Sequence, residues 1–147
     1  MPVVKIIQGD LLDATESVIC QQSNCITTTG RGLYEKIAKR YPWSDTYANR
    51  SCRSTPGSIE VNTKDGKSVV HMFAQVFPGR AKEGKNQGDG SLDRIRNFKK
   101  CLDEIDRLEL GVVAMPYLIG CGLAGGEWEV YKKMLAACDT HIVLYKL

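Results

Sequence analysis

The 147-residue sequence lacks the patterns that mark membrane proteins, zinc proteins and dedicated nucleic-acid binders. No apolar run approaches the ~20 residues that a membrane span needs. None of the six cysteines forms a C-x2-C pair, and the two histidines, His71 and His141, stand far apart, so a zinc site is not expected. The net charge of +3 is small for a protein that binds nucleic acid electrostatically. We therefore expect no metal, no cofactor, no membrane contact and no nucleic-acid partner.

The composition is that of one globular domain spanning residues 1–147. Apolar residues make up 43% and charged residues 25%, and a chain of this length buries enough surface to fold without disulfides. Cys20 lies in an apolar run and Cys138 ends a helical pattern, so both are expected to be buried thiols. No secretory leader pattern opens the sequence. We expect a monomer in a reducing compartment, the cytoplasm or the nucleus.

Short apolar runs alternate with helical patterns along the chain. Asp65-Gly66 between two extended runs predicts a hairpin. The expected strands cover residues 3–7, 18–22, 58–61, 68–74, 112–115 and 142–145, and the expected helices cover residues 33–41, 44–50, 127–137 and a long segment from Ser91 onward. This order predicts an α/β fold, a three-layer α/β/α sandwich with a mixed central sheet.

The long helix and the segment before it have contrasting patterns. From Ser91 onward, Leu92, Ile95, Phe98, Leu102 and Ile105 form one apolar stripe. Residues 77–90 show no periodicity, which predicts a mobile loop.

Two glycine-containing loops each join a strand to a helix. They cover residues 23–32 and residues 120–126. Free backbone N–H groups at a helix start attract phosphate oxygens, and glycine lets a ligand approach the backbone closely. These glycines could instead serve only tight turns. Four glycines within seven residues of the second loop, matched by the first loop, favour a clamp for two linked phosphates over that alternative. Neither loop is a P-loop, since no Gly-Lys-Ser/Thr follows.

Five motifs give the chain a resemblance to the macrodomain family over nearly its whole length. They are Gly9-Asp10-Leu11-Leu12, Cys20-Gln21-Gln22-Ser23-Asn24-Cys25, Gly30-Arg31-Gly32-Leu33, the run from Pro116 to Gly126 before Glu127-Trp128, and Val143-Leu144-Tyr145. The most similar branch includes terminal ADP-ribose protein glycohydrolases and ADP-ribose 1''-phosphate phosphatases. The resemblance implies that ADP-ribose, or an ADP-ribosylated protein, is the ligand.

The resemblance also implies a role for individual residues. Asp10 would accept a hydrogen bond from the adenine amine, assisted by the N–H of Leu11, and Asn24 would bind the distal ribose. The backbone of both loops would cradle the diphosphate, while Tyr145 and Leu147 would contact adenine. The full ligand-binding set comprises Asp10, Leu11, Gln22, Asn24, Thr29, Gly30, Arg31, Gly32, Leu33, Gly120, Cys121, Gly122, Leu123, Ala124, Tyr145 and Leu147.

Simpler roles compete with several of these assignments. Asp10 could be a turn residue, Asn24 could bond its own loop, and Tyr145 could be a strand aromatic in the core. Arg31 could pair with a phosphate or remain solvated. Trp128 is expected to be a packing residue.

The sequence departs from the glycohydrolase pattern at the two catalytic positions. Where that branch has a lysine and an aspartate, this chain has Gln75 and Ala124. Neither can act as a general base or nucleophile. The candidate catalytic groups are then Asn24, Thr29 and Gln75, acting on a water held against the diphosphate. Asp89 is a weaker candidate. For Asp89 and His71 the sequence favours simpler roles, a solvated loop acid and a strand histidine hydrogen-bonded to a neighbour.

Three functions fit these observations to different degrees. We favour a hydrolase acting on ADP-ribose 1''-phosphate or on ADP-ribosyl esters. The alternative is a non-catalytic ADP-ribose reader, which the substitutions at positions 75 and 124 support. RNA binding is a third possibility, but helical spacing spreads the basic residues around the surface. These residues are Arg31, Lys36, Lys39, Arg40, Arg50 and Arg53.

Overall fold

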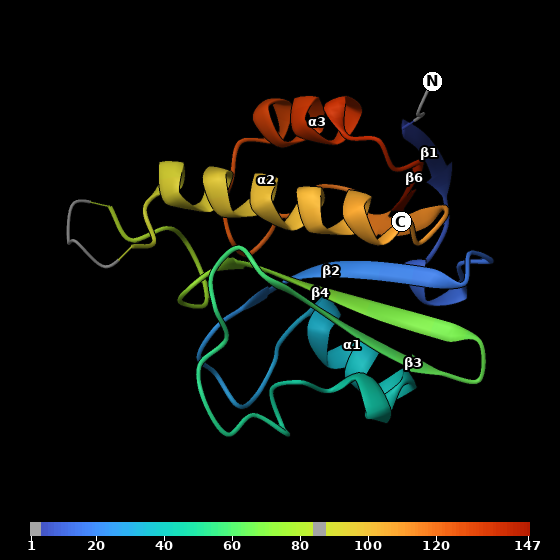
Figure 1. Ribbon diagram of the computed structural model, residues 1–147, viewed down its shortest axis with the longest axis horizontal. Helices are drawn as coiled ribbons and strands as arrows, with labels where there is room; N and C mark the ends of the chain where they lie inside the picture. The colour runs from blue at the N-terminus through green and yellow to red at the C-terminus, as the bar shows by residue number, and fades with distance from the viewer. Residues whose placement is uncertain (1–3, 84–87) are drawn as a thin grey trace.

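A computed structural model describes residues 4–83 and 88–147, and it shows a six-stranded mixed sheet between two helical layers (Figure 1). The strands are β1 (Val4–Gln8), β2 (Val18–Asn24), β3 (Ile59–Lys64), β4 (Lys67–Gln75), β5 (Val113–Pro116) and β6 (Ile142–Lys146). Their spatial order is β1-β6-β5-β2-β4-β3, with only β3 antiparallel to its neighbour. The predicted three-layer α/β/α sandwich is confirmed. Val3, where the first strand was expected to begin, lies outside the described residues.

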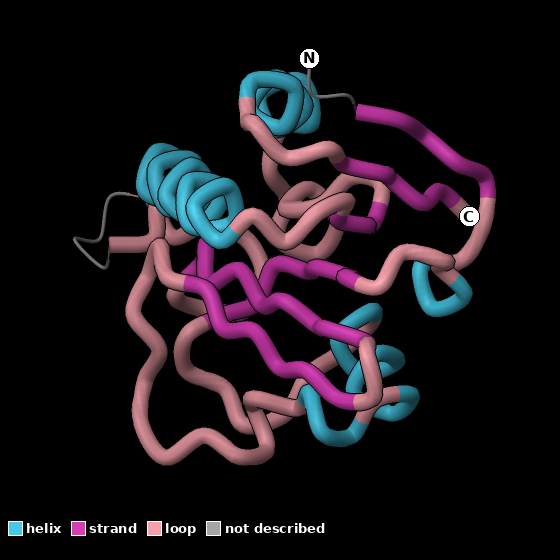
Figure 2. The backbone as a smooth tube through the Cα atoms, turned by 45° about the vertical axis from the view of Figure 1, so that its right-hand side comes forward, coloured by secondary structure: helices cyan, strands magenta, loops and turns pink. Residues whose placement is uncertain are grey.

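The helices divide between the two faces of the sheet (Figures 1 and 2). Helices α2 (Ser91–Leu108) and α3 (Trp128–Ala137) cover one face, and α1 (Leu33–Arg40) covers the other. The larger apolar cluster lies under α2 and α3, and includes Phe98, Leu102 and Ile105 of the predicted stripe. A smaller cluster, around Ile19 and Ile37, lies under α1.

Leu92 does not belong to the buried stripe of α2, contrary to expectation, since it is 64% exposed. A helix turns by 360° in 3.6 residues, which places Leu92 about 120° away from Phe98 around the axis. The same geometry places Arg94 on the buried side, one turn before Phe98, and Arg94 is only 2% exposed.

The β3–β4 hairpin turns at Asp65-Gly66, as the sequence predicts. Both residues have positive φ, 52° and 78°. This conformation matches the twist of the flanking strands, and it explains the need for Gly at the second position.

The prediction of a helix over residues 44–50 is wrong. A short 3-10 helix covers Pro42–Ser44 instead, and turns follow it. Ser44 donates its hydroxyl to the carbonyl of Tyr41 (2.7 Å) rather than capping a helix. The Tyr34 hydroxyl then donates to Asp45 and accepts from the backbone N–H of Tyr47, both at 2.9 Å. These long-range contacts fix the segment in a non-helical path.

The buried thiols and the strand histidine match expectation. Cys20 and Cys138 are buried, and all six cysteines are free. On β4, His71 is fully buried, with Nε2 at 2.7 Å from the carbonyl oxygen of Ser44 and Nδ1 at 3.2 Å from the Ser23 hydroxyl. Burial lowers the pKa of His71 below its ordinary value. His71 therefore serves the fold of the sheet.

Candidate functional site

The predicted site residues gather at one edge of the sheet. Strands β1, β6, β5, β2 and β4 are parallel, so their carboxyl ends share that edge. Asp10 follows β1, Asn24 and Gln75 end β2 and β4, and Tyr145 lies at the end of β6. In open α/β sheets this edge is where ligands bind.

The two glycine loops are neighbours at the middle of that edge. Strands β2 and β5 pair directly, so the loop from β2 to α1 runs beside the loop from β5 to α3. A Cβ built on Gly32 would lie 3.3 Å from Cδ1 of Leu123, which reaches across from the second loop. The loops thus present their backbones to one place, as a clamp for linked phosphates requires.

The glycines of the second loop differ in what requires them. A Cβ on Gly120, where φ is +78°, would lie 2.7 Å from Tyr131 and 2.9 Å from Oε1 of Gln22. Gly125 also has positive φ (+75°), and Gly126 would place a Cβ 2.6 Å from the Gly120 carbonyl oxygen. These three glycines are needed for the shape of the loop itself. Gly122 is exposed and has no atom within 4 Å of an added Cβ, so its backbone is open to a ligand.

Asn24 ends β2 in a turn that its own side chain stabilises. Oδ1 accepts hydrogen bonds from the backbone N–H groups of Ile26 (3.0 Å) and Thr27 (2.9 Å) and from the Thr27 hydroxyl (3.1 Å). The side-chain carbonyl therefore shapes the first loop, the simpler role weighed for this residue. The amide Nδ2 has no hydrogen-bond partner among the described residues, which leaves a donor for a ligand hydroxyl.

Gln75 is linked to the second loop through Gln22. Nε2 of Gln22 donates to Oε1 of Gln75 (2.7 Å), and Nε2 of Gln75 donates to the Phe77 carbonyl (2.8 Å). Oε1 of Gln22 is buried without a partner and lies against Gly120. No local pattern predicts this Gln22–Gln75 contact, because the two residues lie 53 positions apart in the chain. The oxygen and the nitrogen of the Gln75 amide thus each have a hydrogen-bond partner. This arrangement suits a residue that positions a ligand better than one that transfers a proton.

Asp10 and Tyr145 lie together at the far end of the edge. The backbone N–H of Gly9 donates to the Lys146 carbonyl (2.9 Å), which holds the end of β1 against the end of β6. Oδ1 of Asp10 accepts from the Leu12 N–H (2.9 Å), as a turn residue does, and the Tyr145 hydroxyl donates to Glu16 (2.6 Å). Leu147 is 81% exposed. This end can supply one carboxylate oxygen and a tyrosine ring to a ligand.

The interpretation of Asp89 as a solvated loop acid is wrong. It is fully buried, and its carboxylate accepts hydrogen bonds from the backbone N–H groups of Val76 (2.8 Å) and Phe77 (3.1 Å). Arg94 completes the site with an ion pair at 2.7 Å. Its Nη1 also donates to the carbonyls of Gly79 (2.7 Å) and Ala124 (3.3 Å). The pair ties the 77–83 part of the predicted mobile loop to the second glycine loop, while residues 84–87 lie outside the described part of the chain.

The remaining loop residues offer contacts but no activated nucleophile. Thr29 and Arg31 are exposed on the first loop, and Leu33 begins α1. Burial raises the pKa of Cys121, in the second loop, to about 11. Burial likewise raises the pKa of Cys25 to about 11, although the positive charge of Arg50 opposes it. Both thiols are therefore protonated at neutral pH.

Trp128 packs as expected, against the core cluster and with its ring 5.2 Å from that of Tyr117.

Within residues 4–83 and 88–147 there is no cluster of His, Cys, Asp and Glu able to hold a metal ion. Nor does any described helix have the length and apolarity to cross a membrane.

No family model matches the chain, but individual proteins do. It is 23% identical over 150 residues to polyprotein P1234 of Semliki forest virus, covering 98% of this chain and 6% of the polyprotein. It is 27% identical over 149 residues to a DNA ADP-ribosyl glycohydrolase of Mycobacterium tuberculosis, covering 93% of this chain and 40% of that enzyme. The chain therefore spans less than half the length of these relatives.

Solved structures share the fold over nearly the whole chain. A Bacteroides thetaiotaomicron protein superposes with a TM-score of 0.77 at 24% identity, covering 99% of this chain and all of the other. The macrodomain of Mycobacterium tuberculosis DarG superposes with a TM-score of 0.73 at 21% identity, covering 99% and 98%. An Oceanobacillus iheyensis macrodomain mutant with ADPR superposes with a TM-score of 0.61 at 15% identity, covering 99% and 85%.

Proposed function

The chain has the macrodomain fold, and from this premise we propose that it binds ADP-ribose along the carboxyl edge of its sheet and hydrolyses ADP-ribosyl derivatives. The observation that carries the proposal is the pairing of β2 with β5, which brings the two glycine loops together. The backbone of Gly122, in the second loop, has no protein atom packed against it. Two adjacent sets of amide donors suit a diphosphate, whose oxygens only accept hydrogen bonds.

We infer the direction of the ligand from the strand order. Adenine would lie at β1 and β6, where Asp10 can accept from its amine and Tyr145 can contact its ring. The diphosphate would lie between the loops after β5 and β2. The distal ribose would then reach Nδ2 of Asn24, at the end of β2, beside Gln75 on β4.

Hydrolysis at this site would depend on positioned water. Asp89 is engaged by Arg94 and two backbone amides, and Gln75 has no ionisable group. Loss of general acid–base assistance costs about 10²–10⁴ in rate, so turnover is expected to be slow. The substrates that fit best carry a good leaving group on the distal ribose, either the acid of an ester or a 1''-phosphate. The mycobacterial relative, named a DNA ADP-ribosyl glycohydrolase, supports hydrolysis of an ADP-ribosyl derivative.

Product release from purified protein tests the hydrolase proposal. ADP-ribose 1''-phosphate and an ADP-ribosyl ester would be incubated with the wild-type chain and with Asn24→Ala. We expect faster release of phosphate or of the ester acid with the wild type. Equal release by both proteins would refute catalysis at this edge.

A non-catalytic reader is the second candidate. The uncharged residues at positions 75 and 124 support it, because they remove the usual base and nucleophile. Binding of ADP-ribose with no release of product from either substrate would decide for this role.

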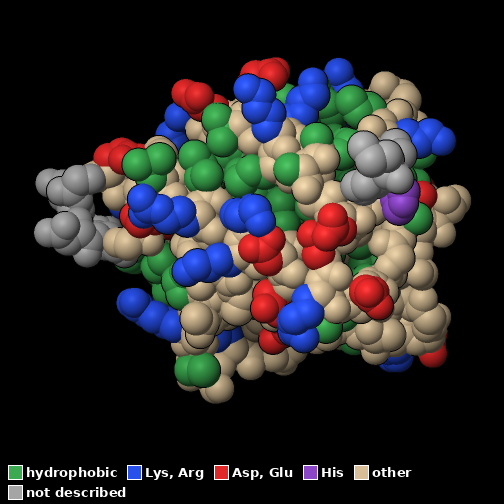
Figure 3. Space-filling model, turned by 45° about the horizontal axis from the view of Figure 1, so that its top comes forward, with side chains coloured by type: hydrophobic (Ala, Val, Ile, Leu, Met, Phe, Trp, Pro, Cys, Tyr) green, Lys and Arg blue, Asp and Glu red, His purple; other side chains and the backbone are tan. Residues whose placement is uncertain are grey.

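The proposal extends to the state of the protein in the cell. Six free thiols fit a reducing compartment, the cytoplasm or the nucleus. We propose a monomer, since positive and negative side chains are interspersed on the face of α2 and α3 seen in Figure 3. Light scattering of the purified chain at two concentrations would test this.

A further inference from the structure

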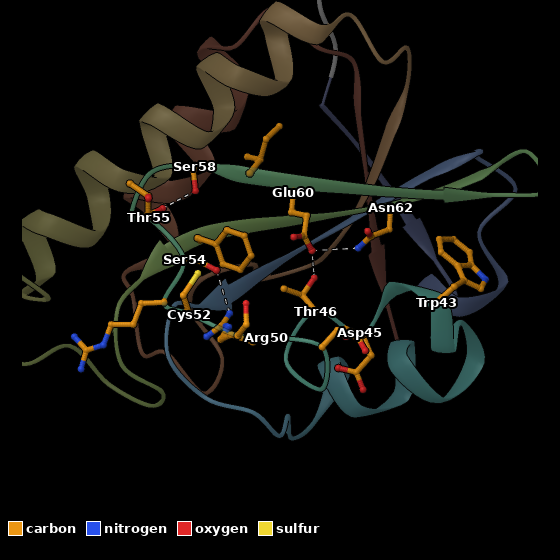
Figure 4. A pocket seen from close by; sticks show the side chains of 15 residues that line it. Trp43, Asp45, Thr46, Arg50, Cys52, Ser54, Thr55, Ser58, Glu60 and Asn62 are labelled. Carbon is orange, nitrogen blue, oxygen red and sulfur yellow. Dashed lines mark hydrogen bonds between the residues drawn. The ribbon is translucent and has the colours of Figure 1, made fainter.

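A polar cavity lies beside β3 and the end of β4 (Figure 4). It has a volume of about 460 Å³, is open to solvent, and is lined by β3, by Phe73 of β4 and by the segment 43–58. Because β3 runs antiparallel to β4, the residues before Ile59 lie at the carboxyl end of β4. The Gly57 N–H donates to the Phe73 carbonyl (2.8 Å), which fixes this position. The cavity therefore continues the edge on which the distal ribose is placed.

The cavity and the first glycine loop are directly connected. Nη2 of Arg50 donates to the backbone carbonyl of Asn24 (2.9 Å). The Ser54 N–H donates to the Cys25 carbonyl (2.9 Å). Any group attached to a ribose at Asn24 would thus lie next to the wall that contains Arg50.

Two guanidinium groups line the cavity without a counter-ion. Among the described residues, neither Arg50 nor Arg53 forms an ion pair. Arg50 packs over the rings of Tyr47 (5.0 Å) and Phe73 (5.7 Å), and its Nε and Nη1 are buried without hydrogen-bond partners. Buried polar groups are almost always paired, so these two nitrogens mark a place where a hydrogen-bond acceptor is missing.

The acids that line the cavity bond to neutral groups and form no ion pair with these arginines. Oε2 of Glu60 accepts from the Thr46 hydroxyl and from Asn62 (3.3 Å). Oδ1 of Asp45 accepts from the Tyr34 hydroxyl (2.9 Å). In Figure 4 Glu60 and Asp45 lie beside Thr46, whereas Arg50 lies beside Cys52 and Ser54.

We propose that the arginine side of this cavity binds a phosphate group carried by the molecule to which the distal ribose is joined. Arg50 and Arg53 supply the charge, and Ser51 and Thr55 supply hydroxyl donors from the same wall. The link to the distal ribose rests on the proposed function, but phosphate binding in the cavity does not.

Nuclear magnetic resonance with inorganic phosphate tests the cavity directly. The ¹⁵N-labelled chain would be titrated to about 10 mM phosphate at constant ionic strength, a range suited to millimolar dissociation constants. We expect saturable shifts in residues 50–55 both before and after saturation with ADP-ribose. Shifts confined to the two glycine loops would overturn the proposal while supporting the diphosphate clamp.

Matched variants separate a specific site from general charge. Arg53→Gln removes an exposed cavity arginine, and Arg40→Gln removes an exposed arginine on α1 outside the cavity. We expect Arg53→Gln to weaken phosphate binding about fivefold and Arg40→Gln less than twofold, since close charge-assisted contacts exceed distant ones. Equal losses in the two variants would refute a built site. Arg50→Lys, which keeps the charge but not the planar fork, should also weaken phosphate binding.

The connection to the proposed function has its own readout. ADP-ribose 1''-phosphate should bind the wild type more tightly than ADP-ribose, and Arg53→Gln should reduce that difference without changing the affinity for ADP-ribose. An unchanged difference in the variant would overturn the link to the distal ribose. Phosphate binding at residues 50–55 with no ADP-ribose binding at all would uphold the anion site and refute the proposed function.

Discussion

Oδ2 of Asp89 lies 2.7 Å from Nη2 of Arg94, and both side chains are almost completely buried, at 0% and 3% exposed. Arg94 also donates hydrogen bonds to the carbonyl of Gly79, in the segment after β4, and to the carbonyl of Ala124, in the second glycine loop. The ion pair thereby joins the segment after β4 to the second glycine loop. Its integrity should matter both for stability and for ligand binding.

Asp89→Asn is expected to lower the free energy of unfolding by about 3–5 kcal/mol, because it leaves the Arg94 charge buried without a counter-ion. Urea denaturation monitored by circular dichroism would measure the change. Arg96→Gln, which removes an exposed partner of Asp93 at 3.7 Å, serves as control and should cost less than about 1 kcal/mol. A loss from Asp89→Asn as small as that of the control would contradict the structural role assigned to the pair.

Gly122→Ala and Gly120→Ala should separate ligand contact from loop shape. An added methyl group at Gly122 meets no atom of the protein, so thermal stability should be nearly unchanged while ADP-ribose affinity falls. At Gly120 the methyl group collides with Tyr131 in a positive-φ backbone, which should cost about 2 kcal/mol or more. Thermal unfolding and calorimetry would be measured for both variants. Unchanged affinity in Gly122→Ala would place the diphosphate away from this loop.

His71 should make folding less stable in mild acid. Its pKa is lowered in the folded state by burial, so the unfolded chain binds more protons once the pH falls through the ordinary histidine range near 6.5. The stability contributed by neutral His71 is therefore complete above that range and declines as the pH drops toward the folded-state pKa. Urea midpoints from pH 8 to pH 5 would show this. His71→Gln should remove the effect, whereas His141→Gln at the exposed histidine should keep it.

The six thiols should react with a disulfide reagent in an order set by burial. Cys52 is exposed and should be labelled first. Half-buried Cys121, with its pKa raised to about 11, should react slowly, and the buried thiols only on unfolding. The buried thiols are Cys20, Cys25, Cys101 and Cys138. Mass spectrometry of partly labelled protein would give the order. Early modification of Cys20 would show that the sheet opens more readily than this packing allows.

Local sequence patterns predicted most of the fold because they depend on near neighbours. Asp65-Gly66 specified a turn with positive φ, and the apolar runs specified strands to within three residues at each end. Segment 44–50 could not be predicted in the same way, since its path is fixed by Tyr34 from another element. Asp89 looked solvated because its partners, Val76, Phe77 and Arg94, become visible only in three dimensions.

One signal for the buried pair was nonetheless present in the sequence. Arg94 lies four residues before Phe98, on the apolar side of its helix, and a charged residue there needs a buried partner. No comparable pattern predicted the unpartnered nitrogens of Arg50, because this residue lies in a segment without periodicity. By contrast, the sequence pattern placed each glycine loop between a strand and a helix, and the structure shows that the two loops follow paired strands.

A crystal structure of the chain with ADP-ribose tests the central claim most directly. The account predicts that the diphosphate oxygens accept hydrogen bonds of about 2.7–3.2 Å from backbone N–H groups of both glycine loops, residues 30–33 and 120–124. Adenine should lie beside Asp10 and the distal ribose beside Asn24. A diphosphate bound by only one loop, or by side chains elsewhere on the sheet, would contradict the account.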